Sequence, residues 1–192
     1  MRFLENGSQK LCEAIEQNSA FESQMKIKLT TLAGWGASVG KDFSNTPKCA
    51  NKSWADAYSL NFQDSTNAQV AKYNAAMRTY FPSDLPHNHQ FAFEGWIGAM
   101  WFTDAARSCG ANLTRTCVEK YMNRPTPYLA RGLLIPSVSF QLGNSHYYNG
   151  LTKQCVSAAQ WSNSANRWIT RATPASNCYQ SRAYSYTLTS PT

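Results

Sequence analysis

The sequence predicts an α/β fold in which short strands alternate with amphipathic helices. Apolar and polar side chains alternate over residues 25–33, as in a strand with one buried face. Apolar side chains then recur at helical spacing between Thr66 and Tyr80. Short alternating runs after Pro127 predict a small set of strands near the carboxyl end.

The composition excludes two classes of protein. The chain has 192 residues, 43% of them hydrophobic, and its most apolar run, residues 91–106, is interrupted by Glu94 and Asp104. That run is therefore too polar for a membrane span, which needs roughly 18 uncharged apolar residues. The formal net charge is +7, but the basic residues are scattered, without a basic cluster or a basic-aromatic motif. We expect no nucleic-acid partner.

The first half of the chain contains three expected elements. A short helix is expected to start near Ser8, and the strand over residues 25–33 ends in Gly34-Trp35-Gly36. Glycines on both sides of a tryptophan allow the backbone to approach a ligand closely, and open α/β sheets bind ligands at such strand ends. A polar loop around Pro47 leads to a second strand over residues 53–62. The buried side chains of this strand would be Trp54, Tyr58, Leu60 and Phe62.

Three helices are expected in the middle of the chain. Thr66 is the expected cap of the first, which Pro82 closes. Residues 91–107 form the second, which is apolar nearly all round and therefore needs neighbours on several sides. Gly110 ends this helix, and Thr114 caps the third. Strands are expected around residues 138–141, 155–158 and 166–170.

The six cysteines predict disulfides. Their number is even and none forms a C-x-x-C motif, which indicates an oxidising compartment. Cys109–Cys117 would staple the connection between two helices, and Cys155–Cys178 would bracket a hairpin. Cys12–Cys49 is the remaining pair and is left open, because six cysteines allow fifteen connectivities. The first residues lack the apolar core of a signal peptide, so we expect a carboxyl-terminal piece of a longer exported precursor.

Several stretches follow one another in a recognisable order. They are YNAAMRTYFP, FAFEGWIGAMWFTDAARSCG, ANLTRTCVEKYM, GLLIPSVSFQLGNSH and a late hairpin with two tryptophans. This order resembles the carboxyl-terminal half of a type I periplasmic solute-binding protein of the kind that serves branched-chain amino acid ABC importers. The resemblance covers about residues 1–172 and is most specific over residues 70–142.

The resemblance implies a fold and a function. The fold would be a partial doubly wound, Rossmann-like lobe with extra helices and a small C-terminal β hairpin. Residues 1–82 would belong to the second lobe, 83–132 to helices returning to a missing first lobe, 133–172 to C-terminal strands and 173–192 to a polar tail. The protein would be an extracytoplasmic receptor that binds a small polar solute, such as an amino acid or an amide, between two lobes. It would deliver the solute to the membrane permease of an ABC importer and would need no cofactor.

Three residues are candidates for ligand contacts. Trp35 lies in the strand-end loop, and Phe91 corresponds to an apolar residue that relatives use as a wall of the cleft. Glu94 lies close to Phe91 in the first turns of the same helix. Trp35 could instead cover the sheet edge, Phe91 could belong to the core, and Glu94 could interact only with the helix dipole. The loop TLAGWGAS lacks the acidic residue with which relatives bind an α-ammonium group, so the solute need not be an amino acid.

The sequence also allows a metal site or a secreted enzyme to be considered. His87 and His89 could begin a metal site, but only Glu94 is near enough in sequence to be a third ligand, so we expect no metal. The alternative to a receptor is a small disulfide-stapled secreted enzyme acting on carbohydrate. Such an enzyme needs two carboxylates with divided acid and base roles, and no pair in the sequence shows that division. We therefore expect no catalytic residues.

Overall fold

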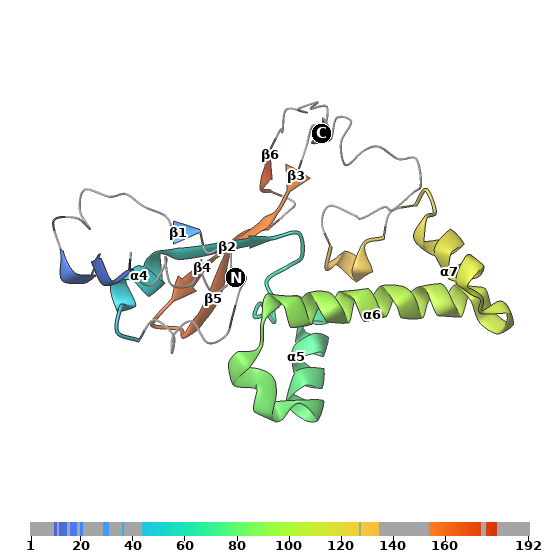
Figure 1. Ribbon diagram of the computed structural model, residues 1–192, viewed down its shortest axis with the longest axis horizontal. Helices are drawn as coiled ribbons and strands as arrows, with labels where there is room; N and C mark the ends of the chain where they lie inside the picture. The colour runs from blue at the N-terminus through green and yellow to red at the C-terminus, as the bar shows by residue number, and fades with distance from the viewer. Residues whose placement is uncertain are drawn as a thin grey trace, which may run out of the picture.

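The computed structural model describes residues 10, 12–14, 16–18, 20, 29–30, 36, 44–126, 128–134, 154–173 and 176–179 (Figure 1). The α-helices that are described from end to end are α4 (Pro47–Lys52), α5 (Ala68–Tyr80), α6 (Gln90–Cys109) and α7 (Arg115–Met122). Short 3-10 helices are η1 (Pro82–His87), η2 (Gly110–Asn112) and η3 (Ala130–Gly132). The strands are β1 (Leu29–Thr30), β2 (Ser53–Ala57), β3 (Gln154–Cys155), β4 (Ser157–Ser162), β5 (Arg167–Ala172) and β6 (Cys178–Tyr179).

The chain combines helices with a small, mainly antiparallel sheet. The strand order is β1-β2-β4-β5, with β1 parallel to β2 and the other neighbours antiparallel. Trp161 of β4 pairs with Trp168 of β5, and both side chains are buried with their rings 5.6 Å apart. This is the expected hairpin with two tryptophans, and aromatic pairs of this kind stabilise a sheet beyond the area that they bury.

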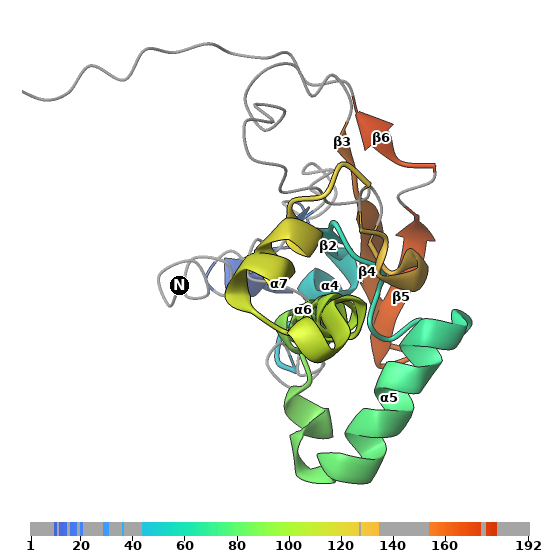
Figure 2. The ribbon, with the colours of Figure 1, turned by 90° about the vertical axis from the view of Figure 1, so that its right-hand side faces the viewer.

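The core lies between the sheet and the two longer helices. Val70 and Tyr73 of α5 and Phe93 and Ile97 of α6 are buried in the same cluster as the hairpin tryptophans. The rings of Tyr73 and Phe93 meet edge to face at 4.9 Å. Figure 2, which looks along α6, shows α5 and the β4–β5 hairpin on the same side of that helix.

The second strand differs from its prediction. It ends at Ala57, and Ser53 and Ala55 are its buried residues, whereas Tyr58 is 55% exposed. Beyond Ala57 the chain leaves β4 and pairs with the segment after η3, since the Leu60 amide donates to the carbonyl of Leu133 at 3.0 Å. The alternation in the sequence runs past this change of partner, so the predicted strand is too long and Tyr58 is exposed, whereas Phe62 is buried as part of the core.

Two local predictions around the first helices were also wrong. The loop expected at Pro47 is instead helix α4, which begins with that proline. Helix α5 is capped by Asn67, whose Oδ1 accepts from the amides of Gln69 and Val70, and not by Thr66. Thr66 donates its hydroxyl to Asp64 instead, at 2.6 Å. Either residue has a capping side chain, and the sequence alone did not separate them.

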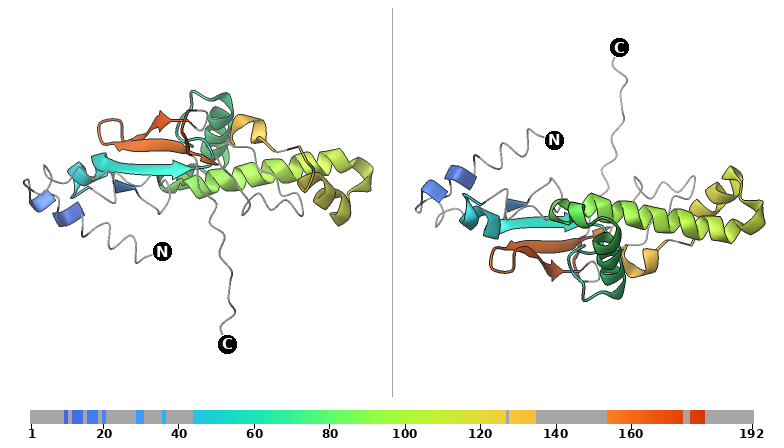
Figure 3. Two further views of the ribbon diagram at one scale, coloured as in Figure 1. Left: turned by 90° about the horizontal axis from the view of Figure 1, so that it is seen from above. Right: turned by 90° about the horizontal axis from the view of Figure 1, so that it is seen from below.

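Helices α6 and α7 and their connection match the prediction closely. Gly110 ends α6 with a positive φ of 56°, a conformation that favours glycine. Thr114 caps α7 by accepting from the amide of Cys117 at 3.2 Å. One stripe of α6 is buried, whereas Phe91 and Phe102 are each more than half exposed. Figure 3 shows α5 and η3 on one side of α6.

The remaining predicted elements are only partly described. Residues 12–14 and 16–17 of the expected first helix are helical, and β1 covers two residues of the strand expected over 25–33. The strand expected at 138–141 lies outside the described residues. Among the helices that the structure describes, none is long and apolar enough to cross a membrane.

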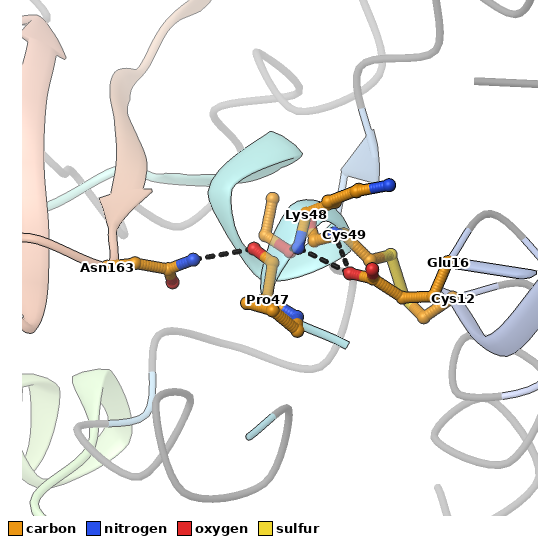
Figure 4. The surroundings of a disulfide bond; sticks show 7 residues. Cys12, Glu16, Pro47, Lys48, Cys49 and Asn163 are labelled. Atoms are coloured by element: carbon orange, nitrogen blue, oxygen red, sulfur yellow. Dashed lines mark hydrogen bonds between the residues drawn. A yellow bond between two sulfur atoms is a disulfide. The ribbon is translucent and has the colours of Figure 1, made fainter. Parts of the chain in front are cut away.

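The two predicted disulfides, Cys109–Cys117 and Cys155–Cys178, are present, and Cys12–Cys49, the pair left open, is the third. This third disulfide joins the amino-terminal segment to α4 (Figure 4). Beside it, Glu16 accepts from the backbone amides of Lys48 and Cys49. On the other side of α4, the Asn163 side chain donates to the carbonyl of Pro47 at 2.6 Å. Helix α4 therefore links the amino-terminal segment to the β4–β5 turn.

We expect the Asp64→Asn substitution to destabilise the protein at neutral pH by about 1 kcal/mol, because Asp64 accepts hydrogen bonds as a charged group. Its Oδ2 accepts from Thr170 of β5 at 2.7 Å, as Oδ1 does from Thr66. Partial burial raises the pKa of Asp64, but these hydrogen bonds and Arg167 outweigh it and lower the pKa below 3.8. The stabilisation is therefore present above pH 3.8 and is lost as the pH falls through the native pKa.

Urea denaturation of both proteins over a range of pH measures this difference in the free energy of unfolding. Asp84→Asn, at an exposed position in η1, is the matched control and should unfold like the parent protein. A difference for Asp64→Asn that persists unchanged into acid would contradict the assignment.

Candidate functional site

The first turn of α6 lies where several separate segments meet. His89, just before the helix, forms an isolated β bridge with Gly36. The carbonyl of Gly36 also accepts from the indole N–H of Trp168 at 3.0 Å. Ser59, shortly after β2, bridges to Leu134 after η3. This turn therefore contacts both the sheet and the segment that follows the helices.

Gln90, the first residue of α6, is the centre of a buried hydrogen-bond network. Its side chain is 2% exposed, and its amide N–H group donates to Ser59 Oγ at 2.5 Å and to the Leu60 carbonyl at 3.1 Å. These two acceptors fix the orientation of the amide. The side-chain oxygen of Gln90 is buried and accepts no hydrogen bond from the described residues. A buried acceptor without a partner costs about 1–3 kcal/mol, so a donor at this point would be favourable.

Glu94 lies one turn further along α6 and extends the same network. Ser59 Oγ donates to its Oε1 over a long 3.5 Å. Burial raises the pKa of Glu94 above 4.5, and the hydrogen bond from Ser59 opposes this only in part. Glu94 as a residue is exposed, but its carboxyl group is partly desolvated and is therefore easier to protonate than a fully solvated one.

Phe91 is 53% exposed beside this network. Its ring lies 4.8 Å from that of His89, and His89 Nδ1 accepts from the Phe91 amide at 3.3 Å. His89 is thus the cap of α6, which accounts for one histidine of the H-x-H pair. Within the described ranges there is no group of three His, Cys, Asp or Glu side chains that could hold a metal ion.

The structure brings together two of the three predicted ligand residues. Phe91 and Glu94 both lie in the first turns of α6, and Trp35 lies outside the described residues. Gly36, which follows Trp35 in the chain, is described and pairs with His89 just before Phe91. The glycine-flanked loop and the start of α6 are therefore adjacent at Gly36.

Sequence reasoning missed Ser59 and Gln90. Ser59 falls on the polar side of a predicted strand, and Gln90 precedes a long apolar run, so both suggest exposed positions. Their burial comes from partners 31 and 30 residues away along the chain. The only available signal was that a glutamine directly precedes the aromatic run.

No family model, curated protein or solved structure matched the chain. The resemblance to type I periplasmic solute-binding proteins therefore stays a prediction. A proposal of function therefore rests on the side chains at the start of α6.

The polar side chains at the start of α6 share one property, the ability to accept hydrogen bonds. The amide oxygen of Gln90, the hydroxyl of Ser59 and the carboxyl of Glu94 can all accept hydrogen bonds, but Gln90 and Ser59 are buried and only Glu94 is exposed. No lysine or arginine in the described part of the chain forms an ion pair with Glu94. The half-exposed ring of Phe91 adds an apolar surface. This combination suits a small solute with hydrogen-bond donors and an apolar part.

We expect Glu94→Gln to gain stability relative to the parent protein as the pH rises from acid to neutral. Because its pKa is raised in the fold, protonated Glu94 contributes stability that is fully present below pH 4.5. That contribution is lost as the pH rises through the native pKa, whereas glutamine stays neutral throughout. The measurement is the free energy of unfolding of both proteins across this pH range. A constant offset between the two curves would show that the Glu94 carboxyl is not desolvated.

Proposed function

We propose that the chain is one half of an extracytoplasmic receptor that binds a small polar solute and delivers it to the membrane permease of an ABC importer. The observation that carries the proposal is that Gly36 pairs with His89, directly before the helical turns that carry Phe91 and Glu94. Residues with solute-binding chemistry thus come from the strand-end loop region and from a helix distant in sequence. Ligand sites in α/β proteins are commonly built in this way.

The exposed face of α6 supports the idea of a half receptor. Phe102 is 55% exposed, and within the described ranges no atom lies within 4 Å of the position that a Cβ would take at Gly95 or Gly98. With Phe91, these residues form a stripe at helical spacing without a charged side chain. An uncovered apolar helix face normally packs on another element. In this proposal a first α/β lobe covers the stripe, and the chain supplies the second lobe.

The proposed mechanism is closure without chemistry. The two lobes exchange between open and closed arrangements, and the solute favours the closed one because it then contacts both lobes. On this chain Phe91 and Trp35 would contact the apolar part of the solute. Glu94 would accept hydrogen bonds from its amide, ammonium or hydroxyl groups.

The disulfides support the proposed location outside the cytoplasm. Three disulfides use all six cysteines of the chain. Stable disulfides form in oxidising compartments, where receptors of importers operate.

Calorimetry against a panel of amino acids, small amides and sugars tests the proposal. We expect no measurable binding by the 192-residue chain alone. A chain joined to a related first lobe should bind, because working sites bury about 70–90% of a small ligand and one lobe covers only part of it. Phe91→Ala should weaken binding by about tenfold, since burying a phenylalanine contributes about 1.5 kcal/mol or more. Trp35→Ala should also weaken it.

Phe81→Ala is the matched control, because Phe81 is 54% exposed and lies beyond α5, and it should leave the affinity unchanged. Tight binding by the short chain, or turnover of any compound in the panel, would contradict the proposal. Turnover would favour the secreted enzyme acting on carbohydrate.

A further inference from the structure

The end of the molecule around α7 carries an excess of positive charge. Residues 104–131 contain five basic side chains, Arg107, Arg115, Lys120, Arg124 and Arg131, against Asp104 and Glu119. Residues 44–94 contain four basic and four acidic side chains and are balanced. We call residues 104–126 and 128–131 the α7 end. Figures 1 and 3 show α7 at the end of α6 that lies away from the main sheet.

Ion pairs neutralise only part of this charge. Arg115 pairs with Glu119 at 2.7 Å, and Arg131 pairs with Asp104 at 3.1 Å. Arg107 and Lys120 are exposed and have no ion pair among the described residues. The guanidinium of Arg124 lies 3.7 Å from the ring centre of Tyr121, which leaves its charge in place. Three positive charges at the α7 end are therefore without an acidic partner among the residues that the structure describes.

An exposed apolar side chain lies between two basic residues in the sequence of the α7 end. Leu113, in the connection between α6 and α7, is 54% exposed. Arg107 precedes it on the last turn of α6, and Arg115 follows it as the first residue of α7. The Cys109–Cys117 disulfide closes the connection, so the leucine is held on a short, rigid turn. A second leucine of the α7 end, Leu129, is 53% exposed.

We propose that the α7 end binds the surface of an anionic phospholipid bilayer. Arg107, Lys120 and Arg124 would contact lipid phosphates, and Leu113 would enter the headgroup layer. Charge complementarity selects an anionic partner, and each Lys or Arg near an anionic membrane adds roughly fivefold to binding. The exposed leucine favours a bilayer over an acidic protein, because apolar side chains flanked by basic ones are typical of peripheral membrane binding.

The proposal goes beyond solute binding and does not depend on it. The residues involved are separated along α6 from Phe91 and Glu94. For a receptor that delivers its solute to a membrane protein, this contact would raise the receptor concentration at the membrane. It would do so without a membrane-spanning segment.

Co-sedimentation of the chain with vesicles tests the proposal. We expect binding to phosphatidylcholine vesicles that contain phosphatidylglycerol, loss of binding at high salt, and no binding to pure phosphatidylcholine. The double variant Arg107→Gln/Lys120→Gln should bind roughly 30-fold more weakly, from about fivefold per charge. Leu113→Gln should weaken binding by about threefold, because half of the leucine is already covered by the protein.

Matched control variants show whether vesicle binding depends on the α7 end or only on the net charge of the chain. Lys72→Gln/Arg78→Gln removes the same charge from exposed positions on α5, and Phe81→Gln removes an equally exposed apolar side chain. Both controls should bind within about twofold of the parent chain if the α7 end is the contact. Circular dichroism confirms that each variant is folded.

Three outcomes would overturn the proposal. The first is no binding to anionic vesicles at low salt, and the second is an equal loss in the α5 control. The third is binding to a soluble acidic protein that equals vesicle binding and is indifferent to Leu113→Gln. That last result would assign the α7 end to an acidic protein instead. Solute binding by the two-lobed form is measured separately, so failure of one proposal leaves the other standing.

Discussion

The buried amide of Gln90 is the interaction on which the arrangement of the described elements depends. It joins the start of α6 to Ser59 and to the backbone of Leu60, which in turn pair with Leu133 and Leu134 after η3. Ser157 at the start of β4 donates its hydroxyl to the carbonyl of Ser59. One helix, two strands and the segment after η3 therefore meet around a single side chain. An amide with both N–H groups satisfied tolerates little movement, because breaking either bond leaves a buried polar group unpaired.

Because the start of α6 is held in place, the position of the whole helix and of the connection to α7 at its other end is determined. The helix has 20 residues and spans roughly 30 Å. Its first turns carry hydrogen-bond acceptors and a half-exposed phenylalanine, and its last turn carries a basic residue next to the stapled connection to α7. The two ends thus have different surface chemistry. We propose that the first turns of α6 recognise the solute and that the α7 end contacts the membrane.

Sequence patterns correctly predicted the structural features that depend on residues close together in the chain. The bounds of α6, the cap of α7, the Gly110 stop and the disulfides all follow from residues a few positions apart or from cysteine spacing. The predicted strand at β2 was too long, and Tyr58 was wrongly placed on its buried face. The reason is that the chain changes its pairing partner after Ala57, which alternation in the sequence cannot show. Ser59 and Gln90 were missed because their burial depends on partners about 30 residues away. The α7 end becomes one region of the molecule because α7 folds back on α6, which the spacing of the basic residues in the sequence cannot show.

Amide hydrogen exchange on the two-lobed form, with and without a solute identified by calorimetry, tests the central claim most directly. The account predicts that the solute slows exchange at Gly36 and over residues 89–94, and leaves the α7 end unchanged. The amides of Phe93 and Glu94 lie within α6 and report on the turn that carries the site. Protection confined to other parts of the chain, with residues 89–94 unaffected, would contradict the claim that the start of α6 recognises the solute.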